Sequence, residues 1–165
     1  MLEAGAPLEE TVPRLKQAAI LAQQEARFAI LALSSASGTA PFDAALRRYV
    51  DFLVADGELE VDLEVDTGIR LAPDEQIEIF RIVQEGLANV RKHANATRAE
   101  VTIGQRAFGE RFVEIRDDGD GFDGEEQAAG QGLKNMRARA ESIEGGFSLR
   151  SIPGRGTALE VVLRT

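Results

Sequence analysis

The stretch from Ile79 to Ala96 has the sequence IFRIVQEGLANVRKHANA and lies in the most informative predicted helix of the chain. At about 100° per residue, Glu85, Asn89 and Lys92 fall together, roughly opposite an apolar side made of Phe80, Val83, Leu87 and Val90. A carboxylate, an amide oxygen and an ammonium group one turn apart suit a hydrated Mg²⁺ and the phosphates that it bridges, because Mg²⁺ binds oxygen ligands and keeps several waters. An ordinary exposed helix face is the alternative that spacing alone leaves open.

A second informative segment runs from Asp117 to Phe122 with the sequence DDGDGF, directly after an apolar stretch predicted as a strand. Its glycines, Gly119 and Gly121, permit a sharp turn and a close approach to a ligand. Asp117 at the strand end can accept a hydrogen bond from an exocyclic amine such as that of adenine. A calcium loop of the EF-hand type does not fit, because no helix is predicted before Asp117; a plain tight turn remains the alternative.

Two further glycine-rich segments follow. Gly130-Gln131-Gly132-Leu133 opens a predicted helix over about 133 to 143 that carries a cluster of basic residues. A glycine-rich helix N-terminus offers free backbone N–H groups and the positive end of the helix dipole, which favours phosphate binding. Gly154-Arg155-Gly156-Thr157 precedes the last predicted strand and, taken alone, indicates a hairpin turn.

The N-terminal part of the chain is predicted to be helical. Residues 13 to 35 are rich in Ala, Leu, Gln, Arg and Glu, which favour one long helix. Its apolar seam alternates spacings of four and three and consists of Leu15, Ala19, Ala22, Ala26, Ala29 and Leu33. Such a helix needs a partner, which is either its own domain or a second helix in a bundle, and the sequence leaves both open.

The remaining elements predict an α+β fold. After a hinge near residue 37, a helix is expected over 42 to 53, and Asp74 is expected to cap a helix that runs to about His93. Strands are expected over 59–65, 99–103, 112–116, 147–152 and 158–163. Because helices and strands do not alternate regularly, we expect a two-layer sandwich with a mixed, mostly antiparallel sheet covered by helices on one face, preceded by the long N-terminal helix.

Composition excludes several classes of function. The chain has 165 residues, about one domain, and its net charge of −9 (19 basic against 28 acidic residues) would repel nucleic acid. Without cysteine it has no disulfide, thiolate zinc site or thiol nucleophile. The longest apolar stretch, 28–33, is far shorter than the roughly 20 residues of a membrane helix. We therefore expect a cytoplasmic chain that makes no membrane contact.

The order of the four segments is more specific than any one of them. Glu85-x-x-x-Asn89, Asp117-x-Gly119-x-Gly121, Gly130-x-Gly132-Leu133 and Gly154-x-Gly156-Thr157 resemble the successive boxes of the ATP-binding (GHKL) fold of histidine kinases, DNA gyrase, Hsp90 and MutL. The stretch 79–96, together with GQGLKNMRARA at 130–140, is similar to the catalytic domain of sensor histidine kinases of the nitrate-sensor and DesK type. The resemblance covers about residues 57 to 165.

The resemblance implies a role for each site residue. Asn89 would coordinate Mg²⁺, Glu85 would orient a metal-bound water, and Lys92 would reach the phosphates of ATP. The adenine end would be formed by Asp117, Gly119, Gly121 and Thr157, and the phosphate end by Gly130, Gly132 and Leu133. Residues 123 to 129 would form a short mobile lid.

The same resemblance implies three parts and several partners. Residues 1–36 would be part of the dimerisation and phosphotransfer hairpin, 37–56 a hinge and linker helix, and 57–165 the catalytic domain. The partners would be the phosphoacceptor helix of the full-length kinase, a response regulator with a helix-turn-helix output, and a second copy through residues 13–35. The sole histidine, His93, is not in a His-Asp acceptor motif, so we expect it either to have a structural role or to support residues that contact the nucleotide. We expect no autophosphorylation by this chain alone.

Two other functions stay open at the level of the sequence. An anti-sigma-factor serine kinase has the same fold, although the Met-Arg-x-Arg run after Gly132 and the long N-terminal helix argue against it. The other is a nucleotide-binding dimerisation module without phosphotransfer.

Overall fold

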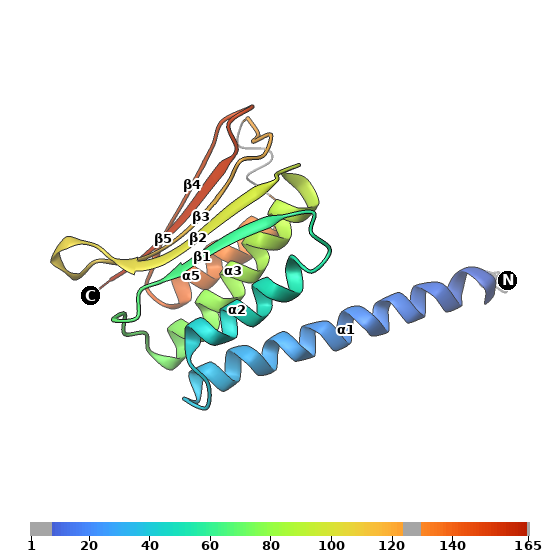
Figure 1. The fold of residues 1–165 in the computed structure, drawn as a ribbon, viewed down its shortest axis with the longest axis horizontal. Coiled ribbons are helices and arrows are strands. Elements are labelled where there is room, and N and C mark those ends of the chain that lie inside the picture. The colour runs from blue at the N-terminus through green and yellow to red at the C-terminus, as the bar shows by residue number, and fades with distance from the viewer. Residues whose placement is uncertain (1–7, 124–129, 165) are drawn as a thin grey trace, which may run out of the picture.

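A computed structural model of the chain describes residues 8–123 and 130–164 and contains one five-stranded sheet (Figure 1). The strand order is β1-β2-β3-β5-β4. Only the edge pair β1–β2 is parallel, and the other neighbours are antiparallel, which confirms a mixed, mostly antiparallel sheet. The strands are β1 (Glu60–Val65), β2 (Arg98–Gln105), β3 (Arg111–Asp117), β4 (Gly146–Ser151) and β5 (Thr157–Leu163).

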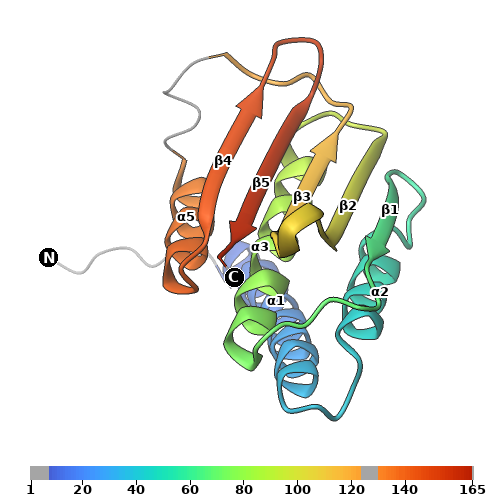
Figure 2. The same ribbon diagram turned by 90° about the vertical axis from the view of Figure 1, so that its left-hand side faces the viewer.

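The helices cover one face of this sheet, as the two perpendicular views show (Figures 1 and 2). They are α1 (Leu8–Ala36), α2 (Phe42–Leu53), α3 (Pro73–His93) and α5 (Gln131–Ser142), with a short 3-10 turn, η1 (Ala107–Gly109), between β2 and β3. The opposite face is open, and alternate residues of β1 point their acidic side chains toward solvent there. The predicted two-layer sandwich is therefore confirmed. Within the described ranges, no helix combines the length and the apolar character needed to cross a bilayer.

The core is centred on α3, which lies between the sheet and the other helices. Phe80, Val83 and Leu87 are completely buried and Val90 nearly so, as their spacing predicted. Ile79 and Ile82 are completely buried as well, because α1, α2 and α5 contact α3 on the sides that the sheet leaves free. This enclosure fixes the rotation of α3 and therefore the direction in which Glu85 and Asn89 point.

The start of α3 differs from the prediction that Asp74 caps it. The helix begins at Pro73. Proline is favoured at this position because it lacks an N–H group, and an N–H group there would have no partner within the helix. The cap position is therefore Ala72, whose backbone N–H donates to the Glu75 carboxylate at 2.8 Å. Asp74 falls inside the first turn, where its charge still suits the helix dipole.

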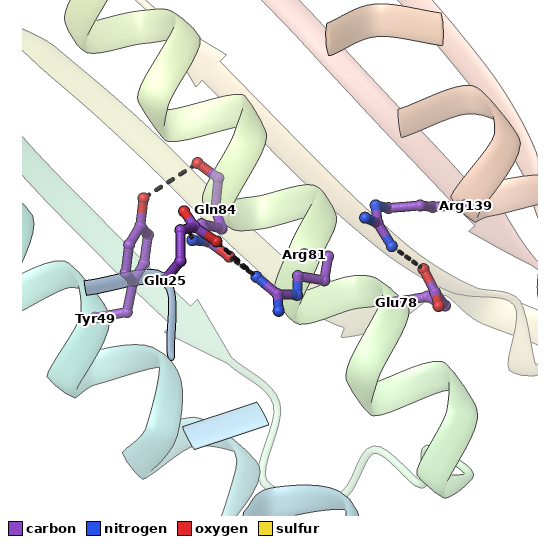
Figure 3. Close-up of polar contacts among 6 residues, drawn as sticks. All are labelled: Glu25, Tyr49, Glu78, Arg81, Gln84 and Arg139. Atoms are coloured by element: carbon purple, nitrogen blue, oxygen red, sulfur yellow. Dashed lines mark hydrogen bonds and ion pairs between the residues drawn. The ribbon is translucent and has the colours of Figure 1, made fainter. Parts of the chain in front are cut away.

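A polar junction joins α1 to the rest of the molecule (Figure 3). Glu25 of α1 pairs with Arg81 of α3 at 3.2 Å and accepts a hydrogen bond from the Gln84 amide at 3.2 Å. The Tyr49 hydroxyl of α2 donates to the backbone carbonyl of Gln84 at 3.1 Å, and burial is the main cause that raises the Tyr49 pKa. Ten residues further along α1, the Ser35 hydroxyl donates to Gln76 at 2.6 Å.

The two halves of α1 have different surroundings. Phe28 and Ala32 are buried against the domain, and Phe28 packs on Tyr49 with ring centroids 4.8 Å apart. Four apolar side chains of the first half are at least about half exposed: Val12, Leu15, Ile20 and Leu21. Ile30 and Leu33 of the second half are exposed as well. One side of the C-terminal half of α1 thus packs on its own domain, and an uncovered apolar surface runs along both halves of the helix.

Candidate functional site

A cavity of about 610 Å³ lies between α3, α5 and the ends of β3, β4 and β5. This volume is within the range of small-molecule sites, about 300–1,000 Å³. Seven of the ten predicted site residues line it: Asn89, Asp117, Gly121, Gly130, Gly132, Leu133 and Thr157. Residues from four separate segments of the sequence therefore meet around one cavity.

The end of the cavity near Asp117 has apolar walls around the Asp117 carboxylate. Ile115, Met136, Leu149 and Leu159 are among the lining residues. Burial is the main cause that raises the pKa of Asp117, while hydrogen bonds from the backbone N–H groups of Gly119 and Thr157 act in the opposite direction. The Gly119 N–H lies 2.9 Å from the carboxylate. A flat apolar ring that carries an amine donor, such as adenine, matches these surroundings.

Glycines at this end are required by close backbone contacts. A Cβ atom on Gly119 would lie 2.1 Å from the carbonyl oxygen of Ala94. On Gly121, where φ is +61°, it would lie 2.2 Å from the carbonyl oxygen of Ile152. Because the obstructing atoms belong to the backbone, no rotamer change can relieve the clash. Gly119 itself does not line the cavity; it lets the loop after β3 pack against the end of α3.

Two side chains outside the predicted set brace the loops of the cavity. Asp118 accepts hydrogen bonds from the Thr97 hydroxyl at 2.7 Å and from the backbone N–H groups of Thr97 and Arg98, each at 2.9 Å. The bond from the Thr97 hydroxyl is the main cause that lowers the pKa of Asp118. The Ser151 hydroxyl accepts from the Phe122 N–H at 2.9 Å and lies 2.9 Å from the Thr157 hydroxyl. Their partners are distant in sequence for the most part, so no local spacing could have revealed either role.

The other end of the cavity combines a helix N-terminus with polar groups of α3. Gly130 precedes the first residue of α5, so the first N–H groups of that helix are available to an anion. A Cβ atom on Gly132 would lie 2.4 Å from a carboxylate oxygen of Glu85 and 3.4 Å from the side-chain amide of Asn89. The absence of a side chain at Gly132 therefore leaves a cradle in which an acid, an amide and the N-terminus of α5 converge.

The oxygen donors at this cradle fit a hydrated divalent cation. Within residues 8–123 and 130–164, no group of three or more His, Asp or Glu side chains is arranged to hold a metal. Glu85 and Asn89 alone would leave most ligand positions of Mg²⁺ to water and phosphate, which is how Mg²⁺ commonly binds beside nucleotides.

The remaining predicted residues are placed as follows. Lys92 is exposed and lies outside the residues that line the cavity. His93, expected to be structural, lines the cavity, as do Gly86 and Phe122, which the sequence did not single out. A Cβ atom on Gly86 would lie 2.6 Å from Ile115, so this glycine lets α3 approach the sheet. Of the predicted lid, 123–129, only Asp123 is within the described residues.

Comparisons with known proteins identify the family of the chain. Residues 74–165 match the family described as histidine kinase-, DNA gyrase B- and HSP90-like ATPase. The chain is 32% identical to the sensor protein VraS of Staphylococcus haemolyticus over 161 residues, which are 94% of this chain and 45% of VraS. It is 35% identical to the signal transduction histidine-protein kinase/phosphatase DegS of Brevibacillus brevis over 117 residues, 69% of this chain and 30% of DegS.

Solved structures share the fold at lower identity. The blue-light activated histidine kinase EL346 of Erythrobacter litoralis aligns with a TM-score of 0.69 and 16% identity over 99% of this chain and 61% of that chain. The histidine kinase AdeS of Acinetobacter baumannii aligns with a TM-score of 0.66 and 12% identity over 98% of this chain and 86% of that chain.

The chain spans less than half the length of the curated relatives described above. The family match covers the segments that form the cavity, from α3 to β5. The chain therefore belongs to the histidine kinase-, DNA gyrase B- and HSP90-like ATPase family, as an ATP-binding domain of the sensor histidine kinase type.

Proposed function

We propose that this chain binds Mg·ATP and transfers the γ-phosphate to a histidine on the phosphoacceptor helix of the full-length kinase. The observation that carries the proposal is the polarity of the cavity. The carboxylate of Asp117 lies among apolar walls at one end, and Glu85, Asn89 and the N-terminus of α5 converge at the other. An adenine ring bound at Asp117 directs the phosphates of ATP toward Glu85, Asn89 and the N-terminus of α5.

The residues of this chain position ATP and neutralise its charge, and they form no covalent bond with it. Asp117 accepts the adenine amine, Gly121 and Thr157 flank the base, and Gly119 holds the loop after β3. At the other end, Gly130, Gly132 and Leu133 border the phosphates. When bound, Mg²⁺ neutralises phosphate charge, and Asn89 and Glu85 are the residues that would hold it. Lys92, exposed on α3, is free to extend toward the phosphates once they are bound.

The transfer itself needs a nucleophile from another segment. An imidazole nitrogen of the acceptor histidine forms a bond to the γ-phosphorus, the bond from that phosphorus to the bridging oxygen breaks, ADP leaves, and the imidazole proton passes to solvent. His93 is not assigned as the acceptor, because it is not followed by the acidic residue of a His-Asp acceptor motif.

The same proposal assigns the other parts of the chain. Residues 1–36 form part of the dimerisation and phosphotransfer hairpin, residues 37–56 a hinge and linker helix, and residues 57–165 the catalytic domain. The exposed apolar side chains of α1 support a homodimer through residues 13–35. A response regulator with a helix-turn-helix output receives the phosphate, and the reaction takes place in the cytoplasm.

Asn89→Ala tests the transfer. With a separately produced phosphoacceptor hairpin and radiolabelled ATP, the variant should lose at least about a hundredfold in the rate of acid-labile labelling of the hairpin. Gln105→Ala is the control, since it removes an amide side chain that is exposed at the end of β2 and does not line the cavity. Size-exclusion chromatography should show the same oligomeric state for both variants. Equal labelling rates with Asn89→Ala and the unaltered chain would refute the assignment.

A calorimetric titration with ATP separates binding from transfer. Micromolar affinity, about −8 kcal/mol, strengthened by Mg²⁺ and lost in Asp117→Ala, is expected. No detectable binding by a folded chain would contradict the nucleotide assignment. Binding without transfer would instead favour the nucleotide-binding dimerisation module.

A further inference from the structure

A second hollow, of about 410 Å³, lies on the open face of the sheet. Its residues on the strands alternate with buried or partly buried ones: Arg116 follows Ile115, Arg150 follows Leu149, and Ala158 precedes Leu159. They therefore point away from the helices. Asp117 and Thr157 line both this hollow and the nucleotide cavity, so the two lie back to back across the ends of β3 and β5.

The strand register explains the shape of the hollow. Ala158 of β5 lies opposite Arg116 of β3 on one side and opposite Arg150 of β4 on the other. Two strand spacings put the arginine backbones about 10 Å apart, and the methyl group between them is too short to fill the gap. Arg155, in the turn between β4 and β5, also lines the hollow. We call Arg116, Arg150, Arg155 and Ala158 the basic notch.

The unmatched charge in the hollow is positive. Arg116 already pairs with Glu114 at 2.8 Å, and the acidic lining residue Glu100 lies 3.7 Å from Arg98. Asp118, also in the lining, accepts three hydrogen bonds from Thr97 and Arg98.

The two remaining arginines have no such partner. Arg150 and Arg155 are exposed, and neither forms an ion pair with a residue of 8–123 or 130–164. They stand together on a chain whose net charge is −9.

We propose that the basic notch is the docking point for an acidic segment of a partner protein, whose carboxylates pair with Arg150 and Arg155. The guanidinium group holds a carboxylate through two parallel hydrogen bonds, which suits a notch formed by arginines. A protein segment fits better than a small molecule, because both arginines are exposed and the floor is a sheet face, whereas small-molecule sites enclose most of their ligand.

The charge of the rest of the chain makes the notch selective. An acidic partner is repelled by a surface of net charge −9, so favourable contacts at one place fix where it docks. Docking at the notch involves no residue of the phosphate end of the nucleotide cavity, so this inference does not depend on phosphotransfer.

A short fluorescent peptide of alternating glutamate and glycine tests the proposal by fluorescence anisotropy, with the same peptide carrying glutamine as its control. A non-hydrolysable ATP analogue is present throughout, so that the peptide does not enter the nucleotide cavity. The double variant Arg150→Gln/Arg155→Gln should bind the glutamate peptide about tenfold more weakly, and binding should weaken as salt is added. Affinity for the ATP analogue, measured separately, checks that the variant is folded.

The control variant is Arg47→Gln/Arg48→Gln, which makes the same change of charge at exposed positions of α2. It should bind the peptide within about twofold of the unaltered chain. Backbone amide chemical shifts should change around Arg150, Arg155 and Ala158 when the glutamate peptide is added. The proposal would be overturned if both double variants bound the glutamate peptide equally weakly, or if the glutamine peptide bound as tightly as the glutamate peptide. Chemical-shift changes confined to other surfaces would also overturn it.

Discussion

The turn between β4 and β5 offers a matched pair of substitutions that tests the geometry of the proposed nucleotide site. Gly154 has φ +74° and Gly156 has φ +80°, so alanine is strained to a similar extent at both. A Cβ atom on Gly154 would meet nothing within 4 Å. On Gly156 it would lie 2.0 Å from the carbonyl oxygen of Asp117 and 3.2 Å from its carboxylate. The two variants therefore differ mainly in whether they displace Asp117.

The magnitudes follow from these contacts. Gly154→Ala should lower the free energy of unfolding by about 1–2 kcal/mol, the cost of a left-handed alanine. Gly156→Ala should cost about 1–3 kcal/mol more, because a carbon and an oxygen normally stay at least about 3.3 Å apart and the ends of β3 and β5 must separate. A displacement of about 1 Å at Asp117 should weaken ATP binding at least tenfold, whereas Gly154→Ala should leave the ATP Kd within about twofold.

Urea unfolding followed by circular dichroism gives the first quantity, and calorimetric titration with ATP gives the second. The comparison depends on the difference between the variants and not on either value alone. If Gly154→Ala and Gly156→Ala had the same stability and the same ATP affinity, the close approach of Gly156 to Asp117 would not hold Asp117 in place, and the reasoning would fail.

Three further predictions concern the framework around the site. Phe28→Ala should lower the free energy of unfolding by about 3–4 kcal/mol, because Phe28 is 5% exposed. Phe108→Ala makes the same change at a fully exposed position between β2 and β3 and should change it by less than about 0.5 kcal/mol; equal effects of the two variants in urea unfolding would contradict this. Because burial raises the pKa of Tyr49, the folded chain keeps the phenol proton at a pH where the unfolded chain releases it, so the free energy of unfolding should fall as pH rises above about 10. Tyr49→Phe should remove this contribution to the pH dependence of the free energy of unfolding, and the same pH dependence in both proteins would contradict the reasoning. Arg111→Gln should lower the free energy of unfolding by about 2–3 kcal/mol, because Arg111 donates two hydrogen bonds of 2.7 and 2.9 Å to the partly buried Glu75 carboxylate. An unchanged thermal unfolding midpoint would show that this pair does not stabilise the fold.

Much of the fold was accessible from the sequence because its signals are local. The apolar side of α3 follows from helical spacing, and the elements other than the N-terminal helix lie within about two residues of their predicted bounds. The N-terminal helix differs more: α1 begins at Leu8 instead of residue 13, and Pro13 lies inside it. Seven of the predicted site residues meet at one cavity, because each belongs to a motif with its own local chemistry. The cap of α3 was predicted wrongly, since Pro73 at the first helical position moves the cap to Ala72.

The parts that could not be predicted depend on which strands become neighbours. Ala158 carries no signal in the sequence, and it forms the floor of the basic notch only because β5 lies between β3 and β4. The bracing by Asp118 likewise requires the loop before β2 to meet the end of β3. The sequence indicated that the long N-terminal helix needs a partner, but the pairing of Glu25 with Arg81 is visible only in three dimensions.

The junction of α1, α2 and α3 also has a practical consequence. The chain contains one tyrosine and no tryptophan, and that tyrosine, Tyr49, is 3% exposed between Phe28 and Phe80 and bonded to the backbone of Gln84. The ultraviolet emission of the unlabelled chain therefore comes largely from one point, where the N-terminal helix touches the helix that bears Glu85 and Asn89. Quenching or recovery of that emission is an intrinsic optical reporter of how the N-terminal helix sits on the ATP-binding domain, with no dye attached and no residue replaced.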